Sequence, residues 1–301
     1  MNQHKHALSP LSNPLLQLSL SMFIFGTIGI FVRHIPFPSS VIALARGGIG
    51  MLFLLLVVLV SRKKISKTDI RRNLIPLCLS GFFLGFNWIL LFEAYRYTTV
   101  ATATLCYYLA PVIVILVSPV ILKEKLTAKK LICVAVALLG MVFVSGILET
   151  GLPTVGESKG ILFGIAAASF YASVVLCNKH IHDISSYDMT IMQLGIATVV
   201  LFPYTLLTES IGDLQFTAGA LGMLLFVAIV HTGVAYALYF SSMQGLSSHT
   251  IAIFSYVDPI VAIILSAILL HEPMGIFGVI GAVLILGSTL ISGLPDKNET
   301  A

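Results

Sequence analysis

The chain has 301 residues, of which 57% are hydrophobic and 10% charged, and its formal net charge is +4. Soluble domains carry about 25% charged residues, so this composition excludes an ordinary water-soluble protein. The small net charge predicts no nucleic-acid partner, and four cysteines scattered in apolar stretches predict neither disulfides nor a metal site: Cys78, Cys106, Cys133 and Cys177.

After a polar tail over residues 1–13, ten apolar runs follow, each near the length of about 20 residues that an α-helix needs to cross a bilayer. They cover residues 14–33, 40–60, 74–95, 100–122, 130–148, 159–178, 189–208, 217–240, 249–270 and 275–293. The first run is too long for a cleavable signal peptide, and none alternates as a transmembrane strand would. We therefore expect an all-α integral membrane protein with ten transmembrane helices.

The basic residues indicate the orientation of these spans. Ten of them follow the second and fourth spans: Arg62, Lys63, Lys64, Lys67, Arg71 and Arg72, then Lys123, Lys125, Lys129 and Lys130. Lys5, Lys179 and Lys297 fall on the same side, whereas only Arg33, Arg96 and Lys159 fall on the other. Cytoplasmic segments are enriched in Lys and Arg, so we expect a multi-pass protein of the cell membrane with both termini in the cytoplasm.

The second half of the chain repeats the first. At an offset of 148 residues these pairs match: Tyr108 with Tyr256, Pro111 with Pro259, Glu124 with Glu272, Gly85 with Gly233 and Thr102 with Thr250. Each half holds five spans, and because five is odd, the second half must enter the membrane from the opposite side. We expect two inverted five-helix repeats, as in secondary transporters, over residues 14–150 and 159–293, with a linker over 151–158 and a C-terminal tail over 294–301.

The motifs of the chain resemble the EamA family of the drug/metabolite transporter superfamily over nearly the whole length. In the first half they run from Glu93 to Ala103, then through Tyr108-Leu109-Ala110-Pro111 to Lys123-Glu124-Lys125-Leu126. In the second half they are Ser247 to Ala252, Tyr256-Val257-Asp258-Pro259 and His271-Glu272-Pro273. The chain departs from the family by carrying Asp258 where a glutamate is usual, and Ala110 at the matching first-half position.

This resemblance implies a basket of ten helices. Spans 3, 4, 8 and 9 would line a central cavity, spans 1, 2, 6 and 7 would open and close it, and spans 5 and 10 would be scaffold and could form a dimer surface. Members of the family move amino acids, other small metabolites or toxic organic compounds, often outward. The resemblance implies no cofactor and no metal.

Two charged residues lie inside the predicted spans. Insertion of Arg or Asp at the bilayer centre costs about 2.5–3.5 kcal/mol, so Arg46 must contact a substrate carboxylate, a fixed anionic partner or a helix end. Gln193 lies near the repeat position of Arg46 and could supply a second hydrogen-bonding group. Asp258 could contact the substrate or couple a proton, or it could be solvated near the outer rim.

Pro111 and Pro259 lie inside the fourth and ninth spans. A proline in a helix leaves the carbonyl four residues earlier without its hydrogen bond, here the carbonyls of Tyr107 and Ser255. Transporters build mid-membrane sites from such discontinuous helices. We therefore expect the two prolines to act as hinges, the alternative being kinks that only shape packing.

Polar and aromatic residues near the middle of the spans are candidates for the wall of the cavity. The set is Asn87, Trp88, Tyr107, Tyr108, His231, Tyr236, Tyr239 and Tyr256. Tyr and Trp also gather at membrane interfaces without binding a ligand, but these positions are not terminal. Because buried hydroxyl and indole groups need partners, the set favours a wet cavity or a bound amphipathic solute.

Other residues have structural interpretations. Glu93 and Arg96 are expected at a solvated rim, and Glu124 and Glu272 are expected to cap helix ends or to pair with basic residues. The loop with His180, His182 and Asp183 is expected to be polar rather than metal-binding. Three glycine patterns are expected to permit close helix packing: Gly81-x-x-x-Gly85, Gly160-x-x-x-Gly164, and Gly275 with Gly278 and Gly281. The pattern of Gly275, Gly278 and Gly281 could also serve a homodimer contact.

The function predicted from these features is secondary transport of a small organic metabolite by alternating access. An amino acid or a related amphipathic solute is the preferred substrate, and export is the preferred direction. A channel or a structural membrane protein is the alternative, although a channel would usually show a ring of repeated polar residues along a pore. An intramembrane enzyme is the third hypothesis, but the chain has no HExxH motif and no P-loop, so we expect no catalysis.

Overall fold

The computed structural model describes residues 13–123, 126–150, 152–243, 246, 248–272 and 274–294. The helices of the first half are α1 (Pro14–His34), α2 (Ser39–Val60), α3 (Lys67–Arg72), α4 (Leu74–Tyr97), α5 (Val100–Tyr107), α6 (Ala110–Ile121), α7 (Ala128–Val144) and α8 (Ile147–Thr150). Those of the second half are α9 (Val155–Asn178), α10 (Ser186–Thr208), η2 (Ile211–Asp213), α11 (Ala218–Phe226), η3 (Val227–Val234), α12 (Ala235–Met243), α13 (Ser248–Phe254), α14 (Val257–Leu269) and α15 (Ile276–Ser292). Glu124 and both tails of the chain lie outside the described residues.

Within the described residues, seven helical segments are long and apolar enough to cross a membrane. They are Pro14–His34, Ser39–Val60, Leu74–Tyr97, Val100–Ile121, Val155–Asn178, Ser186–Thr208 and Ala218–Met243. The other three expected spans correspond to α7, to α13 with α14, and to α15. Helices α7 and α15 have 17 residues each, and α14 has 13. Composition therefore predicts the apolar segments correctly, but some form shorter helices than expected.

Local hydrogen bonding moves one expected boundary and forms one helix that was not expected. The sixth span begins at Val155 and not at residue 159, because Thr154 and Glu157 form a capping box in which each side chain accepts from the other's backbone N–H. The basic segment after α2 contains the short helix α3, which was not predicted; the Ser66 hydroxyl accepts from Asp69 N at 3.3 Å and caps it.

The fourth and ninth spans are interrupted where prolines were expected to break them. Helix α5 ends at Tyr107 and α6 begins at Ala110, while α13 ends at Phe254 and α14 begins at Val257. The eighth span has a different irregularity, since its middle is the π-helix η3, which the sequence analysis did not foresee. Isolated π-helical turns occur frequently at functional sites.

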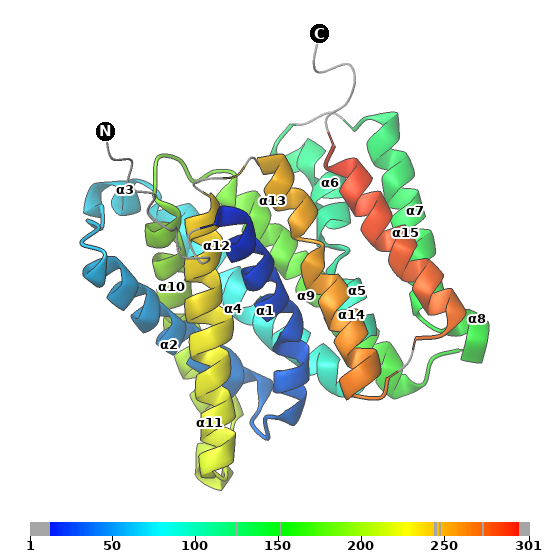
Figure 1. Cartoon of the computed structure of the whole chain (residues 1–301), viewed down its shortest axis with the longest axis horizontal. Coiled ribbons are helices and arrows are strands. Elements are labelled where there is room, and N and C mark those ends of the chain that lie inside the picture. Colours follow the sequence, from blue (N-terminus) through cyan, green and yellow to red (C-terminus); the bar gives the residue numbers. More distant parts are fainter. Residues whose placement is uncertain are drawn as a thin grey trace, which may run out of the picture.

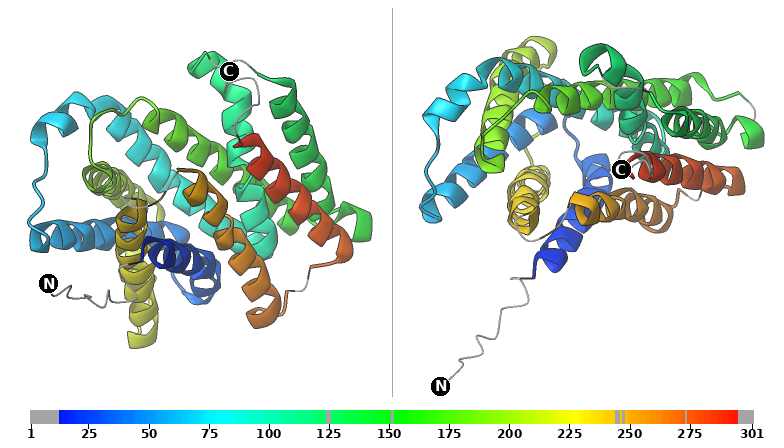
Figure 2. Two further views of the ribbon diagram at one scale, coloured as in Figure 1. Left: turned by 45° about the horizontal axis from the view of Figure 1, so that its top comes forward. Right: turned by 90° about the horizontal axis from the view of Figure 1, so that it is seen from above.

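The helices form two layers. Seen from above in Figure 2, α4, α9 and α7 lie in one layer and α12, α1, α14 and α15 in the other. Within the layers α4 packs on α9, and α1 packs on both α12 and α14. Helices α7 and α15 pack on each other at one edge of the molecule, away from α2 and α10 (Figure 1).

Glycines permit the closest of these helix contacts. A Cβ atom at Gly81 would lie 2.7 Å from the Ile196 side chain of α10, so this glycine serves packing as predicted. On α15, a Cβ atom at Gly281 would lie 2.6 Å from the carbonyl oxygen of Gly140 on α7. Gly281, one of the glycines that could have served a dimer contact, therefore packs against α7 of the same chain.

Candidate functional site: a polar aromatic cavity between the layers

A cavity of about 380 Å³ lies between the two layers. Its wall contains most of the predicted site residues: Arg46, Trp88, Tyr107, Tyr108, Tyr236, Tyr239, Tyr256 and Asp258, with Pro111 beside them. They come from α2, α4, α5, α6, α12, α14 and the two helix interruptions. Residues more than 200 positions apart in the sequence thus share one wall, and the volume suits a small solute.

Arg46 lies on α2 and is only 4% exposed. Its Nε atom donates to the Thr232 hydroxyl at 3.0 Å, and its guanidinium carbon lies 4.2 Å from the centroid of the Trp88 ring. No acidic side chain in the described part of the chain pairs with it. Two terminal amino groups therefore remain on a guanidinium whose position is fixed by a hydrogen bond and by a cation–π contact.

The π-helix η3 supplies the partner of Arg46 and also contacts α1. Thr27 on α1 donates its hydroxyl proton to the carbonyl of Ile24 at 2.7 Å, so it accepts from Nε2 of His231 at 2.8 Å. His231 is 1% exposed. The two consecutive residues His231 and Thr232 thus bind α1 and α2 respectively, and this irregular segment links both helices to the eighth span.

Asp258 lies at the break between α13 and α14 and faces the cavity. The Tyr108 hydroxyl lies 3.1 Å from Asp258 Oδ2 and 3.3 Å from the carbonyl oxygen of Ser255. This carbonyl is the one that Pro259 deprives of its helical partner. Tyr108, from the break between α5 and α6, thus contacts the break between α13 and α14. No basic group within the described ranges forms an ion pair with Asp258.

Four predicted site residues lie away from the lining of this cavity: Asn87, Gln193, His231 and Pro259. The Asn87 amide donates to the carbonyl of Ala167 on α9 at 2.7 Å. The Gln193 amide donates to Ser80 and Asn178, both at 2.7 Å. These polar groups contribute to helix–helix contacts, and Gln193, unlike Arg46, does not line the cavity.

The cavity also contains residues that the sequence analysis did not select, among them Phe25, Tyr95, Thr104, Tyr171 and Ser255. Tyr171 comes from α9, and Phe25 comes from α1. Both lie near the middle of apolar spans, the same signal that identified Tyr107 and Tyr236. Tyr171 could therefore have been found by extending the search for mid-span aromatic residues to the sixth span.

The loop after α9 has no metal-binding geometry among the described residues, which contain no group of three or more His, Cys, Asp or Glu side chains placed to hold an ion. Asp183 instead pairs with Arg72 at 3.4 Å. The backbone N–H and C=O groups of His182 bond to the Asn73 side chain. This loop serves to attach α9 to the N-terminal end of α4.

Comparison with known proteins agrees with the architecture. The model of the EamA-like transporter family matches residues 13–146 and 158–294. The chain is 32% identical over 293 residues to an uncharacterized transporter of Bacillus subtilis, YxxF, covering 96% of this chain and 93% of the relative. Protein PecM of Dickeya dadantii is 26% identical over 215 residues, 71% of each chain.

A third relative and a solved structure extend the similarity. An uncharacterized transporter of Archaeoglobus fulgidus is 26% identical over 274 residues, 91% of this chain and 93% of that protein. One crystal structure superimposes with a TM-score of 0.65 at 16% identity and covers 96% of this chain and 99% of its own, so the two share a fold. The chain is thus a multi-pass membrane protein that belongs to the EamA-like transporter family of the drug/metabolite transporter superfamily.

Proposed function

We propose that the chain is a secondary carrier that exports a small amphipathic zwitterion, of which a neutral amino acid is the simplest example, by alternating access across the cell membrane. The observation that carries this proposal is a basic and an acidic side chain in one cavity, each without an ion-pair partner. Arg46 and Asp258 both line it, and neither has an ion-pair partner among the described residues. A solute with a carboxylate and an ammonium group would satisfy both.

The remaining wall of the cavity favours an apolar body on the same solute. The cavity is lined by Trp88, Phe92 and Tyr236 together with other aromatic and aliphatic side chains. Pockets for small molecules commonly combine such apolar walls with a few convergent polar groups that fix orientation. A carboxylate would accept from the free amino groups of Arg46, and an ammonium would donate to Asp258 beside Tyr108.

We further propose the ten-helix inverted repeat, with repeats over residues 14–150 and 159–293, a linker over 151–158, short tails and both termini in the cytoplasm. The packing of the helices supports it. Under exchange of the halves, α1 corresponds to α9, α2 to α10, and α4 to α11–α12. The contact of α4 with α9 then matches that of α12 with α1, and the contact of α4 with α10 matches that of η3 with α2.

The breaks support alternating access around this cavity. Both interrupted spans contribute residues to the wall, with Tyr107 and Pro111 on one side and Ser255 and Asp258 on the other. Short half-helices on either side of a break can tilt without disrupting a long hydrogen-bonded helix. The prolines are therefore proposed hinges, and Asn87 and Gln193 are proposed to hold the helix contacts about which the halves move.

Ligand binding by the purified protein tests the substrate proposal directly. Each neutral amino acid is compared with its amide, which lacks the carboxylate, and with its deaminated acid, which lacks the ammonium. A ligand at 100 times its Kd stabilises the folded protein by about 2.7 kcal/mol, so an amino acid that binds should raise the melting temperature while its two analogues should not. Counterflow of the same labelled amino acid in proteoliposomes then distinguishes a carrier from a channel. Equal stabilisation by all three members of a set would contradict recognition of a zwitterion.

A further inference from the structure

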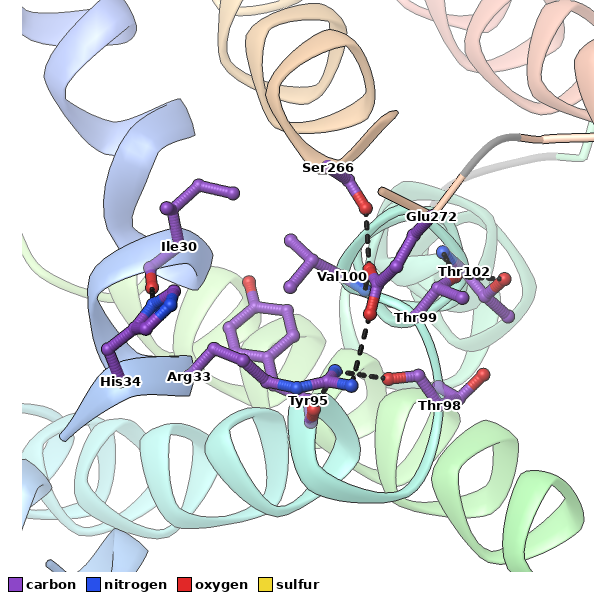
Figure 3. Close-up of polar contacts among 10 residues, drawn as sticks. All are labelled: Ile30, Arg33, His34, Tyr95, Thr98, Thr99, Val100, Thr102, Ser266 and Glu272. Carbon is purple, nitrogen blue, oxygen red and sulfur yellow. Dashed lines mark hydrogen bonds and ion pairs between the residues drawn. The ribbon is translucent and has the colours of Figure 1, made fainter. Parts of the chain in front are cut away.

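One group of polar contacts joins four helices at the C-terminal end of α1 (Figure 3). The Arg33 guanidinium donates to the carbonyl oxygens of Tyr95 at 2.5 Å and Thr98 at 2.9 Å, and it pairs with Glu272 at 3.0 Å. The other carboxylate oxygen of Glu272 accepts from Val100 N at 3.1 Å and from the Ser266 hydroxyl at 2.7 Å. We call these six residues the Arg33–Glu272 cluster.

The cluster lies directly beyond one end of the cavity. Tyr95 belongs to both, because its side chain lines the cavity and its carbonyl accepts from Arg33. Ile28 on α1 and Thr104 on α5 also line the cavity, and each lies about one turn of helix from a member of the cluster. Any solute that left the cavity toward this end would have to pass between the elements that the cluster joins.

The packing beneath the cluster is tight. A Cβ atom at Gly29 on α1 would lie 2.5 Å from a methyl group of Val100 and 3.4 Å from the Tyr95 ring. Helix α1 therefore lies against the start of α5 with no space for a side chain between them. The contact between α1 and α5 beside the cavity is therefore tight, and the cluster joins the same two helices.

We propose that the Arg33–Glu272 cluster is a gate that closes the cavity on the outer side of the membrane. The outer position follows from the proposed orientation, in which the end of α1, the start of α5 and the end of α14 all face outward. The inference rests on the proposed alternating access. Opening would require α1 to move away from α5 and α14, so the bonds of Arg33 would break and re-form in each cycle.

The chemistry of the cluster suits a contact that must open. The Glu272 carboxylate keeps its bonds to Val100 N and Ser266 when α1 leaves, so it is not left as an isolated charge in an apolar environment. The Arg33 side chain is already 34% exposed, and it can be hydrated as soon as it leaves. Each side of the broken ion pair thus retains polar partners, which keeps the free energy of opening small.

Access of a thiol reagent to the cavity from each face tests the gate. The four native cysteines are replaced, and Ser255→Cys places one thiol in the cavity wall. Labelling by a membrane-impermeant methanethiosulfonate is timed in intact cells and in inverted vesicles. In Arg33→Gln and in Glu272→Gln the outer labelling rate should rise by up to about fivefold, the population shift expected when a partly exposed ion pair worth up to about 1 kcal/mol is lost, while the inner rate should fall.

The control is Glu93→Gln, which removes the half-buried acid that lies 3.9 Å from Arg96 at the same end of α4. This variant should label like the parent. Opposite changes at the two faces would support the gate, because a loosened fold would label faster from both. Unchanged rates in both cluster variants, or a rise at both faces, would overturn it.

The labelling and counterflow experiments distinguish failure of the gate from failure of the proposed function. If the protein catalyses counterflow but the labelling rates of the variants are unchanged, the gate is wrong and the carrier stands. If the labelling rates shift but no tested amino acid shows counterflow, the gate stands and the proposed substrate is wrong.

Discussion

Arg46 provides the sharpest test of how the cavity recognises its solute. Its Nε atom donates to Thr232, and its guanidinium carbon lies 4.2 Å from the centroid of the Trp88 ring, so the two terminal amino groups remain for a solute in the cavity. A carboxylate would accept two parallel hydrogen bonds from them. Arg46→Lys replaces this fork by one ammonium group, and Arg46→Gln removes the charge while keeping an amide donor.

The expected loss follows from the number of hydrogen bonds removed. A hydrogen bond to a charged group contributes about 1.5–3 kcal/mol, and each 1.4 kcal/mol is a factor of about ten in affinity. Loss of one arm of the fork in Arg46→Lys should therefore weaken binding of the amino acid by about 10- to 100-fold. Arg46→Gln should weaken it further, because the charge is lost as well.

Affinity and melting temperature are measured together on the same preparations. The matched control is Arg96→Lys, since Arg96 donates to the carbonyl of Phe37 at the rim and does not line the cavity. The control should keep the parent affinity. The reasoning about Arg46 is refuted if both of its variants bind the amino acid normally but melt at much lower temperature, because Arg46 would then serve only the fold through Thr232 and Trp88.

Three further predictions address the fold and the cycle. A reporter active only in the cytoplasm should give signal when fused after the last residue and none when fused after Thr154; the reverse pattern would invalidate the orientation. Pro111→Ala and Pro259→Ala should restore a helical hydrogen bond and reduce counterflow several-fold at normal membrane expression, and wild-type rates in both would show that the breaks are not hinges. Gly281→Ala should lower the melting temperature by separating α15 from α7, whereas Gly287→Ala, with no atom within 4 Å of the added Cβ, should not; equal melting temperatures would contradict the packing argument.

Much of the fold follows from the sequence because the bilayer imposes simple rules. A helix satisfies its own backbone groups, so long apolar runs predict helices even where nothing else is known. Pro111 and Pro259 lie directly after the breaks in theirs, where each ring removes one backbone donor. Pro119 and Pro203, in contrast, lie inside α6 and α10 without interrupting them, so a proline alone does not predict a break. The capping box at Thr154 is also local, and its spacing to Glu157 could have fixed the start of α9 correctly.

Side-chain partners over long sequence distances could not be predicted in this way. Gln193 is a buried amide, which must find hydrogen bonds, but nothing in its spacing shows that Ser80 and Asn178 supply them. The π-helix around His231 could not be predicted either, since its sequence is as apolar as that of the helices on either side. Sequence therefore identified which polar residues must have partners, and only the packing of α4, α9 and α10 decided which of them face the cavity.

The differences between the two halves explain how a pseudo-symmetric fold can recognise an unsymmetric solute. The aromatic residues of the cavity wall occur at equivalent sequence positions in the two halves, since Trp88 corresponds to Tyr236 and Tyr108 to Tyr256. The charges do not agree, because Ala110 stands at the position equivalent to Asp258. An apolar residue there, as in the first half, would avoid about 2.5–3.5 kcal/mol of insertion cost, so cavity shape alone does not require the acid. The proposed repeat thus accounts for the aromatic wall, and the departure from it adds an acidic side chain to the cavity that also holds Arg46, which are the two groups that the proposed zwitterion requires.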